Sequence, residues 1–366
     1  MKWRRYNCET WGVQGALLEI LGFTAVSSSF LLAHTLLYRH LFAFTVFDTH
    51  SPCKLRPALR LISVMTTLQN NQQPQILCIG AILWDVIGRT ERHMRVGSDV
   101  PGRILRLPGG VAMNIAMTFT RFSLKPVLLG AIGQDDAGNE LIRAAHSMGM
   151  ITDHLYRSED LPTDVYMAIE GANGLIAAIA DAHSLEAAGA KILRPLEDGA
   201  LGSDETPYEG TVALDGNLTL ALLEDISNSP LFSKADLRVA PASPGKAERL
   251  LPLMDHPSAT LYVNLEEAGL LLKQEFDTAT DAALALTQRG AARAMVSDGG
   301  RPAAFASGDN VISEAPPEVM VTRVTGAGDT FMAAHIAAEL RGDGNIEALH
   351  TALIAAANYV SGNSPQ

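Results

Sequence analysis

From residue 75 onward, short apolar runs of strand length alternate with segments of helical periodicity. The runs that read as strands cover 75–82, 126–133, 210–215, 236–241, 260–264 and 292–298. A helix-like segment follows each of them, the clearest at 110–122 and 137–150. Strands that are apolar throughout and separated by helices are typical of βαβ units, in which helices cover both faces of a parallel sheet. We therefore predict an α/β fold with three layers, α/β/α, and a mainly parallel central sheet.

Two stretches interrupt this alternation and read as hairpins. They cover about 86–107 and 163–180, and the second has a turn signal at Ala172, Asn173 and Gly174. Because hairpins pair antiparallel strands, these stretches do not fit a parallel βαβ sheet. We predict that they form a small antiparallel β flap beside the main sheet, which acts as a lid.

The first 64 residues differ from the rest in charge. They carry +4, whereas residues 65–366 carry −16. The uncharged apolar run 21–38 is at the lower length limit for a membrane span. A targeting segment and a membrane anchor are therefore both possible interpretations. The interpretation we favour is a dispensable extension or a misassigned start. The working domain is then 65–366, which opens with a polar lead before the first strand, as cytoplasmic domains often do.

Composition excludes several functions. A net charge of −12 argues against a nucleic-acid partner. Cys8, Cys53 and Cys78 show no metal-ligand spacing and fit a reducing compartment. The chain has no GxxxxGK[ST] phosphate loop, and no GxGxxG follows the first strand. The sequence therefore predicts neither a P-loop NTPase nor a dinucleotide-binding protein, and no His/Cys constellation suggests a transition metal.

The stretch TRVTGAGDTFMAAHIAAEL, 322–340, passes from glycines directly into an apolar helix pattern. We predict a helix from about Ala327, with Phe331, Met332, Ile336 and Leu340 on its buried side. A helix start preceded by glycines presents free N–H groups and a partial positive charge, which suits a phosphate. Asp329 lies in the first turn. It is either a functional carboxylate or an ordinary first-turn acid on a core helix.

Polar residues follow several of the other predicted strands. Asp85 comes just past the first one, at the edge where open α/β sheets bind ligands, although a surface turn explains it equally well. Gly109 and Gly110 precede a helix that carries Asn114 one turn inside. These glycines let backbone amides approach a ligand, or they simply start a helix. Asp215 ends another strand, and a plain polar turn is again the alternative.

Two further strand ends have the same double interpretation. Asn264 and Glu267 follow the strand 260–264 at capping-box spacing. They form a helix cap, or they lie near phosphate with Glu267 holding Mg²⁺ through water, since hard cations prefer oxygen ligands. The strand end VSDGG, 296–300, fits either a nucleotide phosphate or a turn.

Taken together and in order, these segments resemble the ribokinase-like, or PfkB, carbohydrate kinase family. The resemblance rests on GGVAMNIAMTFTRFSLKPVLLGAIGQDDAG (109–138), VTGAGDTFMAAHIAA (324–338), the Asn-x-x-Glu element and the strand-end Asp85. It covers roughly residues 75–360. Within the family, the chain is most similar to the pseudouridine kinases, because of RVTGAGD (323–329) and of PASPGK (241–246) after a central strand.

The resemblance implies an ATP-dependent kinase with Mg²⁺ that phosphorylates a nucleoside or a sugar, and pseudouridine is the preferred substrate. It implies that Asp329 is the catalytic base, beside an anion hole made by the amides of Gly326, Ala327 and Gly328. The implied substrate-binding residues are Asp85, Gly109, Gly110, Asn114 and Asp215. The implied nucleotide-binding residues are Asn264, Ser297, Gly299 and Thr325, with Glu267 near the metal.

Two departures from the family pattern qualify these expectations. Arg323 occupies the position of an acid that helps form a monovalent-cation site in relatives, so we expect weak dependence on potassium. The end of the sequence, NYVSGNSPQ, leads us to expect a far wall of the adenine pocket that is either incomplete or differently built. Kinases for ribose, another sugar or another nucleoside remain alternatives, as does a non-catalytic sugar- or nucleoside-binding protein. Relatives suggest a homodimer formed through the lid, and a monomer with the same lid is the open alternative.

Overall fold

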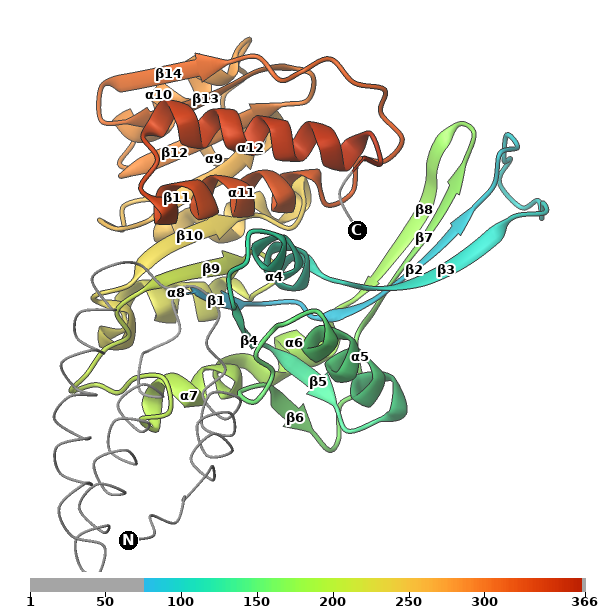
Figure 1. The fold of residues 1–366 in the computed structure, drawn as a ribbon, viewed down its shortest axis with the longest axis horizontal. Helices are drawn as coiled ribbons and strands as arrows, with labels where there is room; N and C mark the ends of the chain where they lie inside the picture. Colours follow the sequence, from blue (N-terminus) through green and yellow to red (C-terminus); the bar gives the residue numbers. More distant parts are fainter. Residues whose placement is uncertain (1–75, 364–366) are drawn as a thin grey trace, which may run out of the picture. The chain divides into compact units, whose positions relative to one another are not determined.

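The computed structural model describes residues 76–363, so the predictions for residues 1–64 lie outside the described residues. An eight-stranded sheet forms the centre (Figure 1). Its parallel strands, in spatial order, are β4 (Val127–Leu129), β1 (Ile76–Ile79), β9 (Thr211–Asp215), β10 (Asp236–Ala240), β11 (Thr260–Asn264) and β12 (Arg293–Asp298). Two antiparallel strands that the sequence analysis did not predict, β13 (Arg301–Ser307) and β14 (Asn310–Glu314), extend the edge beyond β12.

Helices cover both faces of this sheet. Because successive residues of a strand point to opposite sides of the sheet, each strand contributes side chains to both apolar cores. In β1, Leu77 and Ile79 enter one apolar core, whereas Ile76 and Cys78 enter the other. The first core packs against α6 (His183–Ala188), α8 (Leu220–Asn228), α9 (Leu265–Leu272) and α10 (Ala279–Gln288). The second packs against α4 (Val111–Arg121), α5 (Asp136–Ser147), α11 (Ala327–Arg341) and α12 (Asn345–Val360). The predicted three-layer fold is confirmed.

Short elements complete the domain. They are the strands β5 (Ala131–Gly133) and β6 (Tyr156–Ser158), the helix α7 (Arg194–Glu197), and the 3₁₀ segments η1 (Gly189–Leu193), η2 (Pro230–Phe232) and η3 (Pro244–Leu253). The apolar run 126–133 is thus two strands rather than one, split at Gly130. No helix within residues 76–363 is long and apolar enough to cross a membrane.

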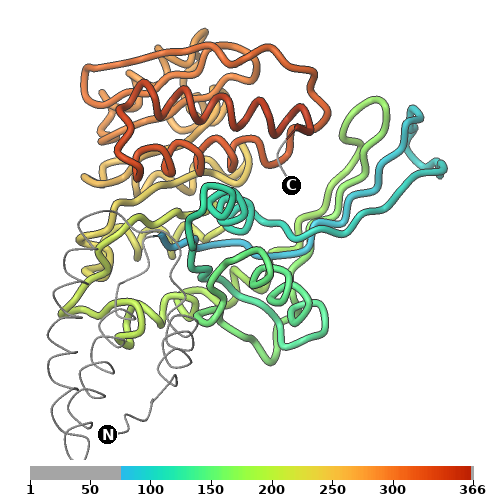
Figure 2. Tube along the Cα trace, in the orientation of Figure 1, coloured from blue at the N-terminus to red at the C-terminus, as the bar shows by residue number. Residues whose placement is uncertain are grey.

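The lid is a separate four-stranded sheet in the order β3 (Arg103–Gly109), β2 (Leu83–Arg89), β7 (Val165–Gly171) and β8 (Gly174–Asp181). Figure 2 shows its two hairpins extending away from the three layers. Each hairpin is antiparallel, but β2 pairs with β7 in parallel, so the lid is mixed rather than wholly antiparallel. The parallel pairing arises because β2 and β7 leave the body of the domain in the same direction. The second hairpin turns at Ala172 and Asn173, as predicted.

Helix α11 is buried on all sides rather than on one face. Residues 329–338 are all buried, including the predicted Phe331, Met332 and Ile336. Ala333, Ala334, Ala337 and Ala338 keep parts of this stretch narrow, and α4 and α12 pack against α11 (Figure 1). The prediction that Leu340 is buried is wrong, since its side chain is 43% exposed. Leu340 lies in the last turn, beyond the buried stretch.

A buried polar network fixes the C-terminal half of α11 on the sheet. The hydroxyl of Tyr262 lies 2.8 Å from Nδ1 of His335, and Arg238 donates a hydrogen bond to the same hydroxyl at 3.0 Å. Arg238 also forms an ion pair with Glu339 on α11. Burial lowers the pKa of His335 to about 3, so its ring is neutral at physiological pH. The position of α11 relative to β10 and β11 is therefore set by polar contacts as well as by packing.

Candidate active site

Four carboxyl groups from distant segments share one neighbourhood at the carboxyl edge of the sheet. Asp215 ends β9, Glu267 lies in the first turn of α9, and Asp85 lies near the start of lid strand β2. The negative charges of all three raise the pKa of the fourth, Asp329 in the first turn of α11. In open α/β sheets, ligands bind at this edge. The structure thus brings together residues that the sequence separates by more than two hundred positions.

Asp329 is buried, and one of its oxygens has a side-chain partner. Nδ2 of Asn114, on α4, donates a hydrogen bond to Oδ2 at 2.8 Å. Within residues 76–363, Oδ1 accepts no hydrogen bond and is available to a ligand. Burial, the largest cause, and the three neighbouring acids raise the pKa of Asp329 to about 7. A carboxyl group with that pKa can accept a proton at neutral pH and suits general base catalysis.

This raised pKa has a consequence for stability. The folded-state pKa of about 7 lies above the ordinary value of 3.8, so between these pH values the folded chain holds a proton that the unfolded chain has lost. Stability therefore falls as pH rises through this window. In Asp329→Asn, the neutral amide should make the folded protein more stable than wild type at pH 8, by about 4 kcal/mol, because each unit between the folded and unfolded pKa values contributes about 1.4 kcal/mol. Near pH 4 the difference should vanish.

Urea unfolding of both proteins at pH 4.5 and pH 8 measures this difference. Asparagine keeps an oxygen that can accept the hydrogen bond from Asn114, so the substitution preserves the local contact. If the variant were less stable than wild type at pH 8, the buried charge of Asp329 would not destabilise the folded protein.

The N-terminus of α11 offers main-chain amides next to Asp329. Gly326 caps the helix with φ 88°, a left-handed conformation that favours glycine. Within the described residues, the N–H groups of Gly326, Gly328 and Asp329 donate no hydrogen bond. The N–H of Ala327 differs from the expectation, because it donates to the carbonyl of Val324 at 3.0 Å. The free amides at this helix end are thus those of 326, 328 and 329, an arrangement that suits an anion.

Asp85 approaches Asp329 from the lid. Its side chain is half-buried, and burial raises its pKa to about 6. It packs directly against Gly109 of β3, where an added Cβ would lie 2.1 Å from Oδ2 of Asp85. Gly109 therefore leaves the space that the carboxylate occupies. A carboxylate at this place on the lid can accept hydrogen bonds from the hydroxyl groups of a ligand.

Asp215 has no exposed surface, and protein groups already bond to its carboxylate. The amides of Ala81 and Asn217 donate to it at 2.8 and 2.7 Å. Asp215 thereby fixes the turn between β1 and the lid strand β2. Lys246 reaches the same cluster, since its Nζ donates to Oδ1 of Asn217 at 2.5 Å. This placement favours a positioning role for Asp215 over direct contact with a substrate.

Asn264 and Glu267 form a complete capping box at the start of α9. Oδ1 of Asn264 accepts from the amide of Glu267, and Oε2 of Glu267 accepts from the amide of Asn264, both at 2.8 Å. The cap does not exclude a second role for Glu267. Burial raises its pKa to about 7, and an approaching cation would stabilise its charged form. Within residues 76–363, no group of three or more His, Cys, Asp or Glu residues could hold a metal by itself.

A cavity of about 540 Å³ opens beside the free amides of α11. The predicted Ser297 and Gly299 line it, together with Ala327 and Gly328. Most of the rest of the wall is apolar and was not predicted as part of a site: Ala303, Pro316, Pro317, Val319, Val321, Val324, Phe331, Leu353, Ala356, Ala357 and Val360. Asp298, Gly300 and Glu318 complete it. The far wall is thus built by the last turns of α12. Its size and apolar lining suit a flat aromatic base with phosphates directed toward Gly328. Thr325 is not among the lining residues.

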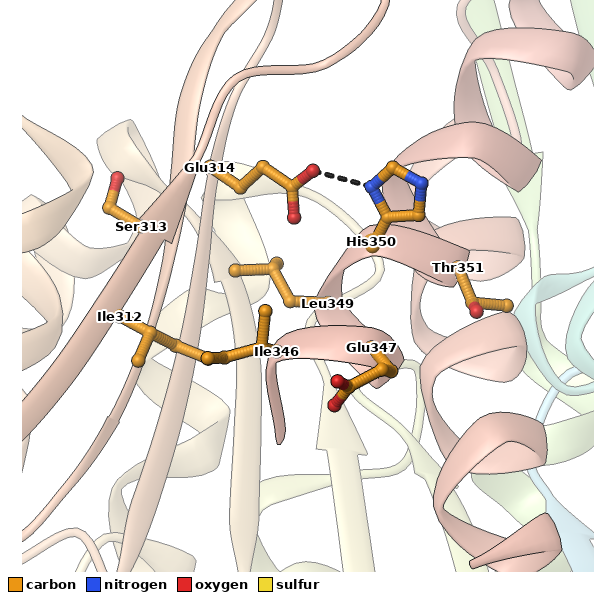
Figure 3. A pocket seen from close by; sticks show the side chains of 8 residues that line it. All are labelled: Ile312, Ser313, Glu314, Ile346, Glu347, Leu349, His350 and Thr351. Carbon is orange, nitrogen blue, oxygen red and sulfur yellow. Dashed lines mark hydrogen bonds and ion pairs between the residues drawn. The ribbon is translucent and has the colours of Figure 1, made fainter. Parts of the chain in front are cut away.

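A second cavity, of about 590 Å³, lies between β14 and α12 and contains none of the predicted site residues. Figure 3 shows its lining, in which the apolar Ile312, Ile346 and Leu349 lie beside five polar side chains, Ser313, Glu314, Glu347, His350 and Thr351. Its only described ion pair joins Glu314 to His350 at the rim. Glu347, in the first turn of α12, lines this cavity, but none of the four clustered carboxyl groups does, so we do not assign the catalytic centre to it.

The architecture and the site together define a ribokinase-like kinase: a three-layer domain with a β lid, and an acid at a helix N-terminus. A family model described as "pfkB family carbohydrate kinase" matches residues 73–366. The chain therefore belongs to the pfkB family of carbohydrate kinases.

Individual relatives agree with this assignment. The chain is 28% identical to the "Bifunctional protein HldE" of Hyphomonas neptunium, over 77% of this chain and 59% of that protein, so it spans less than two thirds of that relative. It is 29% identical to the "Pseudouridine kinase" of Escherichia coli, over 72% of this chain and 82% of that one. A solved carbohydrate kinase from Agrobacterium tumefaciens is 26% identical, with a TM-score of 0.65 over 78% of this chain and 90% of that chain.

Proposed function

We propose that the chain transfers the γ-phosphoryl group of ATP to the 5′-hydroxyl of pseudouridine. The observation that carries this proposal is the placement of Asp329, a buried carboxyl group with a pKa of about 7 beside free amides at a helix N-terminus. Phosphoryl transfer depends mainly on positioning and on stabilising charge, and this site supplies both.

Asp329 accepts the proton of the 5′-hydroxyl through its free oxygen. The bond between O5′ and the γ-phosphorus forms as the bond between the γ-phosphorus and the bridging oxygen breaks, and ADP leaves. The amides of Gly326 and Gly328 stabilise charge on the transferred group. Asn114 holds the other oxygen of Asp329, and Asp85 orients the sugar as the lid excludes water.

Pseudouridine is proposed as the substrate on two grounds. Two relatives carry the name pseudouridine kinase, from Escherichia coli and Arabidopsis thaliana, at 29% and 31% identity, the latter over only 27% of this chain. Lys246, from the stretch that resembles these enzymes, reaches the cluster of Asp215 and Asn217 beside the sugar site. Lys246 is half-buried there and can meet polar atoms of a nucleoside base.

A substrate panel with ATP tests this proposal. We expect pseudouridine to give a higher kcat/KM than uridine, ribose or fructose 6-phosphate. A higher value for ribose or fructose 6-phosphate would favour the alternative of a sugar kinase. Binding of a nucleoside without turnover of any acceptor would favour a non-catalytic binding protein instead.

Glu267 is the residue that would hold Mg²⁺, through water, next to the phosphates. Its buried carboxylate lacks a described cationic partner, which fits a cation that brings most of its ligands as water and phosphate. When bound, Mg²⁺ neutralises phosphate charge. We expect activity to disappear in excess EDTA and to return when Mg²⁺ is restored. Full activity in EDTA would contradict this role.

Potassium dependence should be weak, because Arg323 already supplies a cation. Its Nε donates to the carbonyl of Tyr359 at 2.7 Å, and its guanidinium stacks on the Tyr359 ring at 3.9 Å. A fixed side-chain charge thus bridges the segment before α11 and the end of α12. We expect equal rates in potassium chloride and choline chloride at the same ionic strength. Steep activation by potassium would show that this interpretation is wrong.

The lid supports a proposed homodimer. Ile104, Leu175 and Ile179 are 78%, 61% and 68% exposed on its strands, and a second lid would cover them. Sedimentation equilibrium should find a dimer in wild type and a monomer in Ile104→Lys. A wild-type monomer at all concentrations would dismiss this part of the proposal. We also propose a cytoplasmic location, which fractionation of the native host tests.

A further inference from the structure

The last turn of α12 holds the segment that leads into α11. The amides of Thr322 and Arg323 both donate to the carbonyl of Val360, at 2.8 and 3.2 Å. The hydroxyl of Thr322 donates to the same oxygen at 3.0 Å. The segment before the turn at 326–329 is therefore hydrogen-bonded to the end of α12, which lies more than thirty residues further along the chain.

Tyr359 makes the contact nearest to the free amides. Its hydroxyl donates a hydrogen bond to the carbonyl of Thr325 at 2.8 Å, and the Arg323 guanidinium covers its ring. A Cβ on Gly326 would lie 2.5 Å from this hydroxyl. The charge of Asp329 contributes to raising the pKa of Tyr359, behind the larger effect of burial, so the two groups are electrostatic neighbours. The absence of a side chain at Gly326 therefore leaves the space that the hydroxyl of Tyr359 occupies, next to Asp329.

The geometry of the peptide bond connects this contact to catalysis. The carbonyl of Thr325 and the N–H of Gly326 belong to one planar trans peptide and point in opposite directions. A hydrogen bond that fixes the carbonyl therefore also fixes the direction of the Gly326 N–H. That N–H is one of the described amides without a partner at the start of α11.

We propose that Tyr359 is a positioning residue, whose hydroxyl aims the Gly326 amide at the transferred phosphoryl group. This inference rests on the proposed kinase function. Arg323 holds the ring of Tyr359 in place from above. Leu353, Ala357 and Val360, on the same helix end, line the nucleotide cavity, so the element that aims the amide also contacts the nucleotide.

The test compares Tyr359→Phe with the control Tyr156→Phe. Both variants lose only a hydroxyl group, and Tyr156 lies in β6, outside the site, with no hydrogen bond from its hydroxyl among the described residues. The first readout is hydrogen exchange of the Ala327 and Thr330 amides, which bond to the carbonyls of Val324 and Gly326. The second is kcat and KM for the acceptor that wild type phosphorylates fastest, with the melting temperature recorded for each protein.

We expect Tyr359→Phe to exchange these amides about fivefold faster, as the loss of one hydrogen bond allows. Its kcat should fall by about tenfold to a hundredfold with an unchanged acceptor KM, because a misaimed donor weakens transition-state stabilisation. Tyr156→Phe should match wild type in both. Unchanged exchange, unchanged kcat, or a loss of activity that only follows a lower melting temperature would each overturn the inference. If wild type phosphorylates nothing, the proposed function fails, and hydrogen exchange alone still decides whether Tyr359 fixes the turn.

Discussion

Asp329→Asn is expected to lower kcat by at least about 100-fold, because general base assistance typically contributes that much. The variant should fold, since asparagine has the same shape and can accept the hydrogen bond from Asn114 that holds Oδ2 in wild type. The pH profile gives a second readout. In wild type, kcat/KM should fall below pH 7 as the base becomes protonated, because its pKa is about 7. The residual activity of the variant should lack this limb.

Asp136→Asn is the matched control for this substitution. Asp136 is also an acid in the first turn of a helix, α5, but it is exposed and lies outside the site. It represents the ordinary first-turn acid, whose charge complements the helix dipole. We expect wild-type kcat from this variant. Near-normal turnover in Asp329→Asn would refute the assignment of the base, and an equal loss in both variants would point to helix stability rather than chemistry.

Gly110→Ala is expected to have the other large effect. Gly110 caps α4 with φ 94°, and an added Cβ would lie 2.4 Å from the carbonyl oxygen of Ala81. Because that oxygen belongs to the main chain, α4 or the turn before the lid strand must move. Asn114 on α4 would then release Asp329. We expect a loss of kcat/KM of about 100-fold, as small displacements in an active site can cause, and a lower melting temperature.

Gly149→Ala separates the steric contact with Ala81 from the strain of a left-handed backbone conformation. Gly149 has a similar φ of 89°, but nothing lies within 4 Å of an added Cβ. This variant should lose about 1–2 kcal/mol of stability from the left-handed conformation alone, with kcat/KM unchanged. If Gly110→Ala behaved like Gly149→Ala in both measurements, the contact with Ala81 would not matter for the site.

Local patterns in the sequence predicted the fold because they determine local structure. The apolar runs became the parallel strands, and the turn at Ala172 and Asn173 was placed correctly. The start of α11 at Ala327 was predicted from its glycines. For Asn264 and Glu267, the capping-box alternative describes the hydrogen bonds that the structure shows, whereas the nucleotide and metal roles stay predictions.

Contacts between distant segments could not be predicted in this way. The parallel pairing of β2 with β7 depends on where both strands leave the domain. The apolar wall of the cavity, including Phe331 and Val360, has no signal in the sequence, because its residues look like ordinary core positions of two helices. The bond from Ala327 to Val324 and the contact of Tyr359 with Thr325 likewise arise only from the folded turn.

A crystal structure with a non-hydrolysable ATP analogue and pseudouridine would show directly whether the turn at 326–329 binds the γ-phosphate beside Asp329. We expect the γ-phosphate to lie within hydrogen-bonding distance of the amides of Gly326 and Gly328, with the adenine ring in the cavity walled by α12. The 5′-hydroxyl should lie next to the free oxygen of Asp329. A γ-phosphate bound away from residues 326–329, or an acceptor hydroxyl out of reach of Asp329, would contradict the account.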